Sequence, residues 1–450
     1  MLDLSRLNVR RKISGTISAT APCPHCGSLT KRNEIRSRYF WEPSLTESSV
    51  VEVASGCYLC PQCPTTQKWF TGVPEEFRTR RQYSLVAQQT LIALVQNHRM
   101  SVEGAAAVGR EILHLPELEA TTVLGWLRIA GEAVDAEAHK KAAVEGFSGE
   151  MAVDEVYDGG WYVIKATDPL NGVELSWQLG RGSPSKEDVR GFFLSLKATG
   201  FYPNLVVTDG SNLYPEVLAE VWPESRHQRC VFHFIKQINE DLREVFDAAY
   251  NKLPKPLKRK AGRPKKRGRP RMDKEKREVR RKVRRVRYIV LKAERRLSDK
   301  ERAMLAEAIE LCPRLGVLRL FVLSVHQLFA PETADHAQSE QRRQNILLCC
   351  EFNDLQGLEK SLKRLRDDDL FTRLTRYLDF ENADKTSNHP ERENRIFRKR
   401  QKIHYRLRSF RSLIALLNLL TVRNPMPEQP TRLRRKPPDH VVAKEVCRAA

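Results

Sequence analysis

Three acidic residues stand where their carboxylates can meet and bind metal ions. Asp154 lies in the alternating run 150–156, Asp209 ends the short apolar run 204–209, and Glu391 follows a turn-like stretch and opens a predicted helix. Two carboxylates at strand ends and one on a helix can hold two divalent ions about 4 Å apart. Such a pair activates a water or a 3′-hydroxyl on one side of a phosphorus and stabilises the leaving oxygen on the other. The three acids therefore predict a site for phosphoryl transfer that uses two Mg²⁺ or Mn²⁺ ions.

The segments around these acids predict an α/β domain. Apolar alternation and intervening turn signals indicate five strands, over residues 150–157, 161–167, 173–180, 204–208 and 226–231. Helical spacing of apolar residues indicates helices over 185–198 and 211–221. Three antiparallel strands, a helix and a further strand begin a ribonuclease-H-like layer. This order places Asp154 on the first strand and Asp209 at the end of the fourth.

Cysteines are concentrated near the start of the chain, where five of the ten fall within 75 residues. In a chain without secretion signals, such cysteines indicate metal ligands rather than disulfides. Two pairs share the pattern Cys-Pro-x-Cys, namely Cys23, Cys26, Cys60 and Cys63. Four thiolates in two such pairs fit structural Zn²⁺ in a zinc ribbon. Cys57 in place of Cys63, His25 as a ligand, and ordinary buried cysteines are the alternatives.

Residues 81–135 predict a helix-turn-helix outline. Ser101 is a suitable N-cap for one helix, and a last helix begins near residue 120. Its first turns would present Thr121, Thr122 and Gly125 to the major groove of DNA. Small helical domains with this pattern that do not contact DNA are the alternative.

Positive charge is concentrated in residues 252–287. This run contains twenty lysines and arginines and three acidic residues, so it supplies most of the formal net charge of +22. Its Gly-Arg-Pro segments are extended, and their arginines can follow a narrow minor groove; the candidates are Arg263, Arg267, Arg269 and Arg271. A solvated charged linker and a nuclear-import signal are the alternatives. A helical pattern follows from about residue 279 to 375.

Other function classes are excluded by what the composition lacks. No run of eighteen apolar residues predicts a transmembrane helix, and the N-terminal residues lack an apolar signal region. A membrane role is therefore not expected. The proline-rich segment from residue 423 onward is expected to be disordered.

Four motifs in order resemble those of DDE transposases of bacterial insertion sequences, in the broad Mutator-like group. They are Val153-Asp154-Glu155, Val207-Thr208-Asp209-Gly210, the C-x-x-H pair in Cys230-Val-Phe-His233, and a T-x-N…E-x-x-N segment comprising Thr386, Asn388, Glu391 and Asn394. A helical insertion between the second Asp and the Glu is usual for the group. An upstream zinc ribbon and helix-turn-helix occur in some of its families. The resemblance covers roughly residues 20–420.

This resemblance implies that Asp154, Asp209 and Glu391 are the catalytic metal ligands. Glu393 is the alternative third acid, but Glu391 stands at the E-x-x-N spacing with Asn394, one helical turn away. Cys230 and His233 are expected to position the active site or the cleaved strand. A zinc half-site, or a core cysteine with a satisfied histidine, is the alternative for that pair.

The implied function is metal-dependent cleavage at the ends of a mobile element, followed by strand transfer into target DNA. The implied partners are terminal inverted repeats, target DNA and a second copy of the chain or more. The implied location is cytoplasmic and nucleoid-associated, or nuclear in a eukaryote. A DNA-binding regulator with an idle acidic triad and a nuclease that cuts without joining remain alternatives. The sequence leaves open whether excision is cut-and-paste or copying.

The chain is thus expected to contain six segments. They are a zinc ribbon over 1–75, a helix-turn-helix domain over 76–146, the first part of a ribonuclease-H-like domain over 147–245, a basic linker and helical insertion over 246–380, a last catalytic helix over 381–422, and a disordered tail over 423–450.

Overall fold

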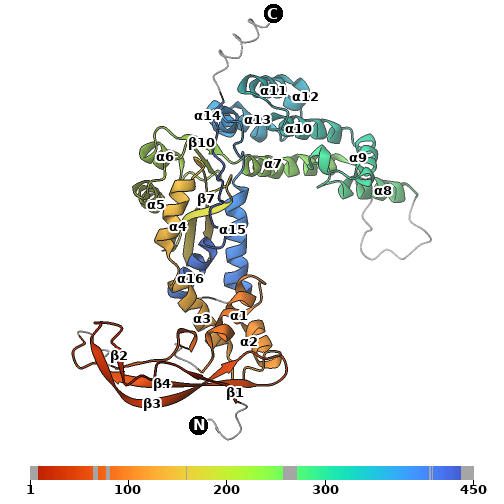
Figure 1. The fold of residues 1–450 in the computed structure, drawn as a ribbon. Coiled ribbons are helices and arrows are strands. Elements are labelled where there is room, and N and C mark those ends of the chain that lie inside the picture. Colours follow the sequence, from red (N-terminus) through yellow and green to blue (C-terminus); the bar gives the residue numbers. More distant parts are fainter. Residues whose placement is uncertain are drawn as a thin grey trace, which may run out of the picture. The chain divides into compact units, whose positions relative to one another are not determined.

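The computed structural model shows a mixed α/β chain (Figure 1) and describes residues 9–63, 69–77, 82–158, 160–256, 271–404, 407 and 409–436. The chain forms two compact units. The first comprises Met1–Ala136 with Arg395–Arg423, and the second comprises Glu137–Asn394 with Asn424–Ala450. None of the described helices combines the length and the apolar character that crossing a bilayer requires.

The first unit begins with a sheet built on a long hairpin. The hairpin strands are β3 (Leu29–Glu42) and β4 (Ser49–Leu59), which pair antiparallel. The short strands pair at the edges of the hairpin: β1 (Val9–Ser14) and β5 (Trp69–Thr71) with β4, and β2 (Thr20–Pro22) with β3. Phe40, Val51, Val53 and Phe77, the last from η2 (Glu75–Phe77), form a small apolar core.

Helices complete the first unit. They are α1 (Leu85–Gln96), α2 (Val102–Glu111), α3 (Ala120–Glu132), the π-helical turn η5 (Arg400–His404) and α16 (Phe410–Thr421). Ser101 caps α2 as predicted, because its hydroxyl accepts a hydrogen bond from the Gly104 amide at 2.9 Å. The expectation that 381–422 contains one last catalytic helix is wrong, because α16 is a separate helix that packs on α3.

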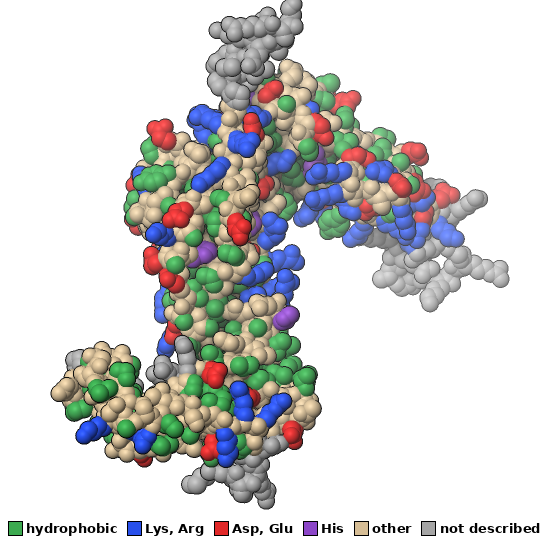
Figure 2. All heavy atoms as spheres, in the orientation of Figure 1, with side chains coloured by type: hydrophobic (Ala, Val, Ile, Leu, Met, Phe, Trp, Pro, Cys, Tyr) green, Lys and Arg blue, Asp and Glu red, His purple; other side chains and the backbone are tan. Residues whose placement is uncertain are grey.

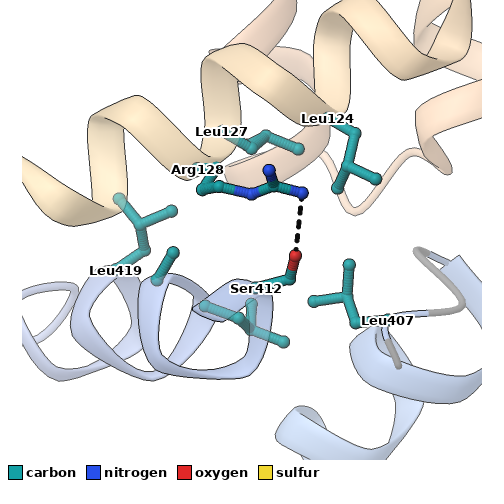
Figure 3. A pocket seen from close by; sticks show the side chains of 8 residues that line it. Leu124, Leu127, Arg128, Leu407, Ser412 and Leu419 are labelled. Carbon is teal, nitrogen blue, oxygen red and sulfur yellow. Dashed lines mark hydrogen bonds between the residues drawn. The ribbon is translucent and has the colours of Figure 1, made fainter. Parts of the chain in front are cut away.

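The contact between α3 and α16 is close and polar at its centre (Figure 3). The Arg128 side chain donates a hydrogen bond to the Ser412 hydroxyl at 3.1 Å, and the Asn418 amide donates to the Gly131 carbonyl at 3.0 Å. A Cβ on Gly131 would lie 2.3 Å from the Ala415 carbonyl oxygen, which is closer than real Cβ contacts come. Gly131 therefore lets two helix backbones touch.

We expect Gly131→Ala to destabilise the first unit by about 1–3 kcal/mol, as overpacking typically does. Gly125→Ala is the matched control in the same helix, because nothing lies within 4 Å of its added Cβ. That variant should be more stable by about 0.5–1 kcal/mol, since alanine favours a helix over glycine. Thermal unfolding of the full chain measures both shifts. Equal melting temperatures for the two variants would contradict the close contact between α3 and α16.

The second unit contains a mixed five-stranded sheet. Its strand order is β10-β9-β6-β7-β8, with bounds β6 (Glu150–Tyr157), β7 (Trp161–Asp168), β8 (Val173–Arg181), β9 (Leu205–Thr208) and β10 (Arg226–Arg229). Strand β7 is antiparallel to β6 and β8, whereas β9 is parallel to β6 and β10. All five strands lie within about two residues of the predicted ranges.

Helices and the C-terminal segment cover the two faces of this sheet. Residues from α5 (Lys186–Thr199) and α6 (Pro215–Val221), including Phe193 and Tyr214, pack on the face that carries Met151 and Val153. The other face carries Ala152, Leu205 and Val207, and Phe380 and Leu433 pack against them. Because side chains alternate along a strand, Asp154 points to the same face as Ala152.

Residues 424–436 differ from the predicted disordered tail. The Leu433 amide donates a hydrogen bond to the Ser148 carbonyl at 2.8 Å, and Lys436 donates to the Asp379 carbonyl at 2.9 Å. Leu433 also packs against the sheet, so burial of this side chain accounts for the order of the segment. Residues 437–450 lie outside the described part of the chain.

The other helices of the second unit include a helical insertion between β10 and α15. They are α4 (Ala136–Gly146), α7 (Val231–Lys252), α8 (Arg271–Arg285), η3 (Glu294–Arg296), α9 (Asp299–Leu311), α10 (Arg314–Leu328), α11 (His336–Leu348), α12 (Cys350–Asn353), α13 (Glu359–Arg366), α14 (Asp368–Thr375), η4 (Arg376–Asp379) and α15 (Asn388–Lys399). One apolar core joins α7 to the insertion, including Phe234, Ile238, Val286 and Phe321. Helix begins at Arg271, earlier than the predicted residue 279.

Candidate active site and cysteine cluster

The first two predicted acids meet beside the end of β9, where β6 continues past it. These strands are parallel neighbours in which Glu150 is opposite Leu205 and Ala152 is opposite Val207. Continuing this register by two residues places Asp154 level with Asp209, just past the end of β9. One carboxylate oxygen from each of Asp154, Asp209 and Glu155 lies within 4.8 Å of the other two. The sheet therefore brings the two predicted aspartates together.

Helix α15 brings the third predicted acid to the same face. The Asn394 side-chain amide donates a hydrogen bond to the Asp154 carboxylate at 2.7 Å. Glu391, one helical turn before Asn394, has a carboxylate oxygen 3.4 Å from Nε2 of His233. The negative charge of Glu391 acts directly on the ionisation of Asp154. Residues some 240 positions apart in the chain thus share one site.

The ionisation of Asp154 shows how crowded this site is. Burial, together with the charges of Asp209 and Glu391, raises the pKa of Asp154 to about 6. The Asn394 hydrogen bond and the positive charge of His233 act in the opposite direction without cancelling the rise. A bound cation would relieve this repulsion, because an opposite charge favours the ionised carboxylate.

Polar atoms left without partners indicate what fits between these groups. Asn394 Oδ1 and Glu391 Oε1 are buried and have no hydrogen-bond partner among the described residues, although the His233 ring lies 3.4 Å from Glu391 Oε1. Buried oxygens rarely remain unsatisfied, so such atoms indicate a place for a water molecule or an ion. Hard divalent cations such as Mg²⁺ prefer oxygen ligands, and carboxylates above all. The donor set therefore fits a divalent metal ion.

Glu393, the alternative third acid, occupies a different place on α15. Its side chain is buried at 7% exposure. Its charge is not among the main influences on the ionisation of Asp154, whereas that of Glu391 is. The geometry favours Glu391 as the acid that faces the two aspartates.

Glu155 belongs to the carboxylate group, although the sequence indicated only a neighbour of Asp154. The Tyr214 hydroxyl donates a hydrogen bond to its carboxylate. Burial, followed by the charge of Asp209, raises the pKa of Glu155 to about 7. The only sequence signal for this residue was its adjacency to Asp154, and alternation on a strand argued against their meeting.

The C-x-x-H pair links the start of α7 to the segment before α15. Cys230 Sγ accepts a hydrogen bond from the Ser387 amide at 3.3 Å, and the Val231 amide donates to the Lys385 carbonyl at 3.0 Å. His233 lies beside Glu391, and its hydrogen bond with Cys230 raises the pKa of His233 to about 9 despite burial. These contacts favour a positioning role for the pair.

A zinc half-site at this pair has less support. Ligand atoms of Cys230, His233 and Glu391 lie within 4.8 Å of one another. No fourth Cys, His, Asp or Glu joins them within the described ranges. Structural zinc sites are almost always four-coordinate, so this group is incomplete as such a site.

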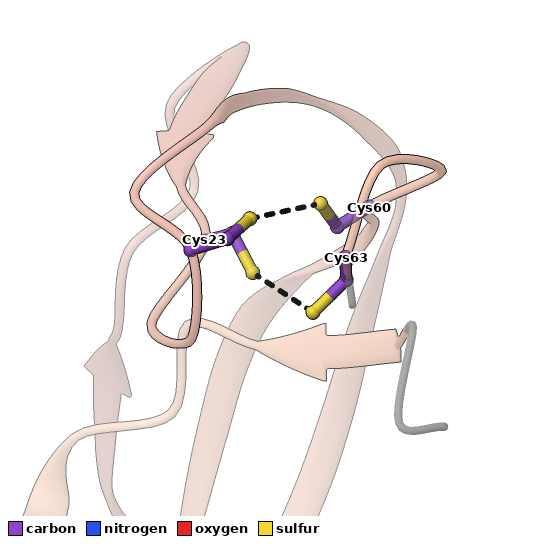
Figure 4. Close-up of side chains that lie close together, drawn as sticks. Cys23, Cys60 and Cys63 are labelled. Carbon is purple, nitrogen blue, oxygen red and sulfur yellow. Dashed lines mark hydrogen bonds between the residues drawn. The ribbon is translucent and has the colours of Figure 1, made fainter. Parts of the chain in front are cut away.

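A separate cluster of four cysteines lies in the first unit (Figure 4). Sulfur atoms of Cys23 and Cys63 are 3.8 Å apart, and those of Cys26 and Cys60 are 3.6 Å apart. All four sulfurs lie within 4.8 Å of one another. Thiolates 2.3 Å from a tetrahedral zinc ion are separated by about 3.8 Å. The spacing therefore fits zinc.

The cluster also bears on the alternative ligands. The first knuckle turns at Gly27, whose φ of +74° lies in the left-handed region that favours glycine. Cys57 lies on β4 outside the group, and His25 does not belong to it either. The predicted choice of Cys63 over Cys57 agrees with this geometry.

The predicted DNA-contacting residues differ in whether the structure describes them and in whether their side chains are exposed. Thr121 is exposed on α3, but Thr122 is buried, so the prediction that Thr122 faces DNA is not supported. Trp126 and Leu127 are buried on the same side of this helix, which accounts for the position of Thr122. Arg263, Arg267 and Arg269 lie outside the described residues. Arg271 opens α8, but its side chain is not described.

A family model of ISL3-type DDE transposases, described as "Transposase", matches residues 157–413, which is more than half of the chain. The match includes Asp209 and Glu391, and Asp154 lies three residues before it. No curated protein matches. A solved structure, "Drosophila P element transposase strand transfer complex", is similar with a TM-score of 0.41 and 11% identity, covering 78% of this chain and 94% of that chain. By the family match, the chain belongs to the ISL3 family of DDE transposases.

Proposed function

We propose that this DDE transposase cuts DNA at the ends of its element and joins them to target DNA, with Asp154, Asp209 and Glu391 as the metal-binding acids. The observation that carries the proposal is that Asp154 and Asp209 meet beside the end of β9, that the charge of Glu391 on α15 acts on Asp154, and that buried oxygens of Glu391 and Asn394 lack hydrogen-bond partners among the described residues. The strand order and directions support a ribonuclease-H-like domain. Glu155 is a fourth acid in the same group.

The chain's own residues hold the acids in place. Asn394 fixes the orientation of the Asp154 carboxylate through their hydrogen bond, and the Ser211 amide holds Asp209 at 2.8 Å. His233 lies beside Glu391 and offsets its charge. Two divalent cations held by these oxygens would activate the attacking hydroxyl and stabilise the leaving oxygen. Cys230 anchors the segment that leads into α15, and so sets where Glu391 lies.

The first unit supplies the proposed means of recognising the element ends. Its cysteine cluster would hold Zn²⁺ in a zinc ribbon, and α1 to α3 would form the helix-turn-helix with Thr121 toward DNA. In the second unit, Arg263, Arg267, Arg269 and Arg271 would contact phosphates or the minor groove. We further propose a dimer or higher assembly on DNA, an origin in a bacterial insertion sequence of the Mutator-like group, and a cytoplasmic, nucleoid-associated location.

A joining assay tests this function. The substrate is labelled DNA that carries the sequences flanking the coding region, mixed with unlabelled supercoiled plasmid. We expect Mg²⁺-dependent cleavage at the flanking ends and transfer of the label into the plasmid, with no product in EDTA or with scrambled ends. Cleavage without transfer would identify a nuclease instead. Binding without cleavage would identify a DNA-binding regulator.

A further inference from the structure

A groove outside the acidic site runs along α7 in the second unit. Its volume is about 820 Å³, and its walls come from α7, residues 288–296, the end of α10 and the segment before α15. Six α7 residues line it, and four of them stand at the helical spacing i, i+4, i+7 and i+11, namely Phe232, Lys236, Asn239 and Arg243. This spacing places them on one face of α7, whereas the core residues Phe234, Ile238 and Leu242 lie on another.

Two aromatic rings in this groove remain accessible to solvent. Phe232 is 47% exposed and Tyr288 is 60% exposed, and both line the groove. The Arg243 guanidinium carbon lies 5.7 Å from the centre of the Tyr288 ring. Aromatic side chains combined with cations form the stacking platforms on which unpaired nucleobases bind.

The charge of the groove is also suited to a nucleic acid. Lys236, Arg243, Arg295 and Arg296 line it, and none of the four forms an ion pair within the described ranges. Lys292 and Lys385 also line the groove, so six cations face three acids there; of these acids, Glu294 is paired with Arg302 and Arg319, and Glu332 and Asp384 are the other two. Lys and Arg side chains gather over α7, α8 and α9 in Figure 2. A cleft with this charge concentrates polyanions.

The groove lies next to the acidic site. Val231 and Thr386 line it, and these residues flank the contacts through which Cys230 holds the segment before α15. Phe232 directly precedes His233, whose ring lies 3.4 Å from the Glu391 carboxylate. A strand that leaves the acids along α7 would therefore enter the groove.

We infer that this groove binds single-stranded DNA, with bases stacked on Phe232 and Tyr288 and phosphates near Lys236 and Arg243. The inference rests on the proposed function, because it takes the occupant to be a strand exposed at the cleavage site. A duplex fits these residues less well, since base pairing and stacking cover the faces that the aromatic rings would contact. The four cations account for affinity, and the two rings account for the preference for unpaired bases.

Fluorescence anisotropy of the full chain with labelled oligothymidylate and with a duplex of equal length tests the inference. We expect Tyr288→Ala and Phe232→Ala each to weaken oligothymidylate binding about tenfold, and the duplex by less than about twofold. Tyr288→Phe should restore oligothymidylate binding, because it keeps the ring. Equal losses for the two DNAs, or unchanged oligothymidylate binding, would overturn the inference.

The salt dependence gives a second, independent readout. Replacing Lys236 and Arg243 together by glutamine should make the slope of log K against log salt shallower by about 1.4 for oligothymidylate, since each single-strand phosphate contact contributes about 0.7. The matched control is Lys141→Gln with Lys300→Gln, which removes the same charge from exposed positions outside the groove. An equal change of slope in the control would show a general charge effect and overturn the inference.

Asp154→Asn separates this inference from the proposed function. That variant should lose DNA cleavage but bind oligothymidylate with the same affinity as the unaltered chain. If groove variants lose oligothymidylate while cleavage proves independent of Asp154, the groove is confirmed and the catalytic proposal fails. If cleavage depends on Asp154 while groove variants bind normally, the groove inference alone is overturned.

Discussion

The rate of Mg²⁺-dependent DNA cleavage is expected to fall by about 10³ or more in each of three variants, Asp154→Asn, Asp209→Asn and Glu391→Gln. Each change removes an anionic oxygen from a site that binds divalent cations through such oxygens, and metal stabilisation of a transition state is worth several kcal/mol. The measurement is the initial rate of cleavage at labelled element ends. Glu224→Gln is a matched control, because Glu224 is an exposed acid in the turn after α6. It should cleave normally.

Comparing variants of Glu391 and Glu393 on α15 identifies the third metal-binding acid. We expect Glu391→Gln to lose cleavage and Glu393→Gln to keep it within about tenfold, because the charge of Glu391, and not that of Glu393, is among the main influences on the ionisation of Asp154. The opposite pattern would transfer the metal-binding role to Glu393. Retained cleavage in both variants would remove α15 from the site.

The melting temperature of Asp154→Asn, compared with that of the unaltered chain, distinguishes a loss of cleavage from a loss of folding. Folding raises the pKa of Asp154 from 3.8 to about 6. A raised pKa means that the folded state favours the protonated acid, so stability falls as pH rises from about 4 through about 6. Above that range and without metal, Asp154→Asn should melt at a higher temperature than the unaltered chain. Added Mg²⁺ should stabilise the unaltered chain and have little effect on the variant.

Cys23→Ser and Cys63→Ser are expected to reduce bound zinc from about one ion per chain to almost none. They should also lower the melting temperature of the first unit by at least about 10 °C, since structural zinc contributes folding free energy directly. Elemental analysis of the purified chain measures the zinc, and a thermal melt measures the stability. The physical reason is that the cysteine turns at the end of the β3–β4 hairpin have only a small apolar neighbourhood.

Cys57→Ser is the control for this zinc site. Cys57 is also buried and lies in the same sheet, but its sulfur is outside the group of four. It should retain one zinc ion per chain even if it melts earlier. Loss of zinc in Cys57→Ser together with retention of zinc in Cys63→Ser would show that Cys57, and not Cys63, is the fourth zinc ligand.

Features set by short stretches of sequence were predictable. Strands β6 to β10 depend on the alternation of apolar residues, the Ser101 cap depends on a side-chain oxygen, and the turn at Gly27 depends on a positive φ. Each of these features is set within a few residues. The pairing of Asp154 with Asp209 followed from placing Asp154 on the first strand and Asp209 at the end of the fourth, although Asp154 lies within β6 and not at its end. Local pattern was therefore sufficient for the framework of the acidic site.

Features that depend on distant contacts were not predictable from one sequence. Glu155 belongs to the carboxylate group because Tyr214 and Asp209 lie close to it, and no sequence pattern in β6 predicts those neighbours. Leu433 is an isolated apolar residue in a polar, proline-rich segment, yet it covers a strand some 280 residues earlier. Thr122 stands at a position where a helix-turn-helix would contact DNA, but packing inside the unit buries it.

The packing of α16 on α3 has a consequence for how the chain matures during synthesis. A ribosome that has completed Glu132 must add roughly 280 further residues before α16 emerges, which takes about 15–60 s at ordinary elongation rates. During that interval the first unit lacks the helix against which Gly131 and Arg128 pack. A nascent transposase would therefore acquire its complete first unit only after Asp154, Asp209 and Glu391 have all been translated, so the proposed recognition of element ends would follow synthesis of the proposed catalytic acids.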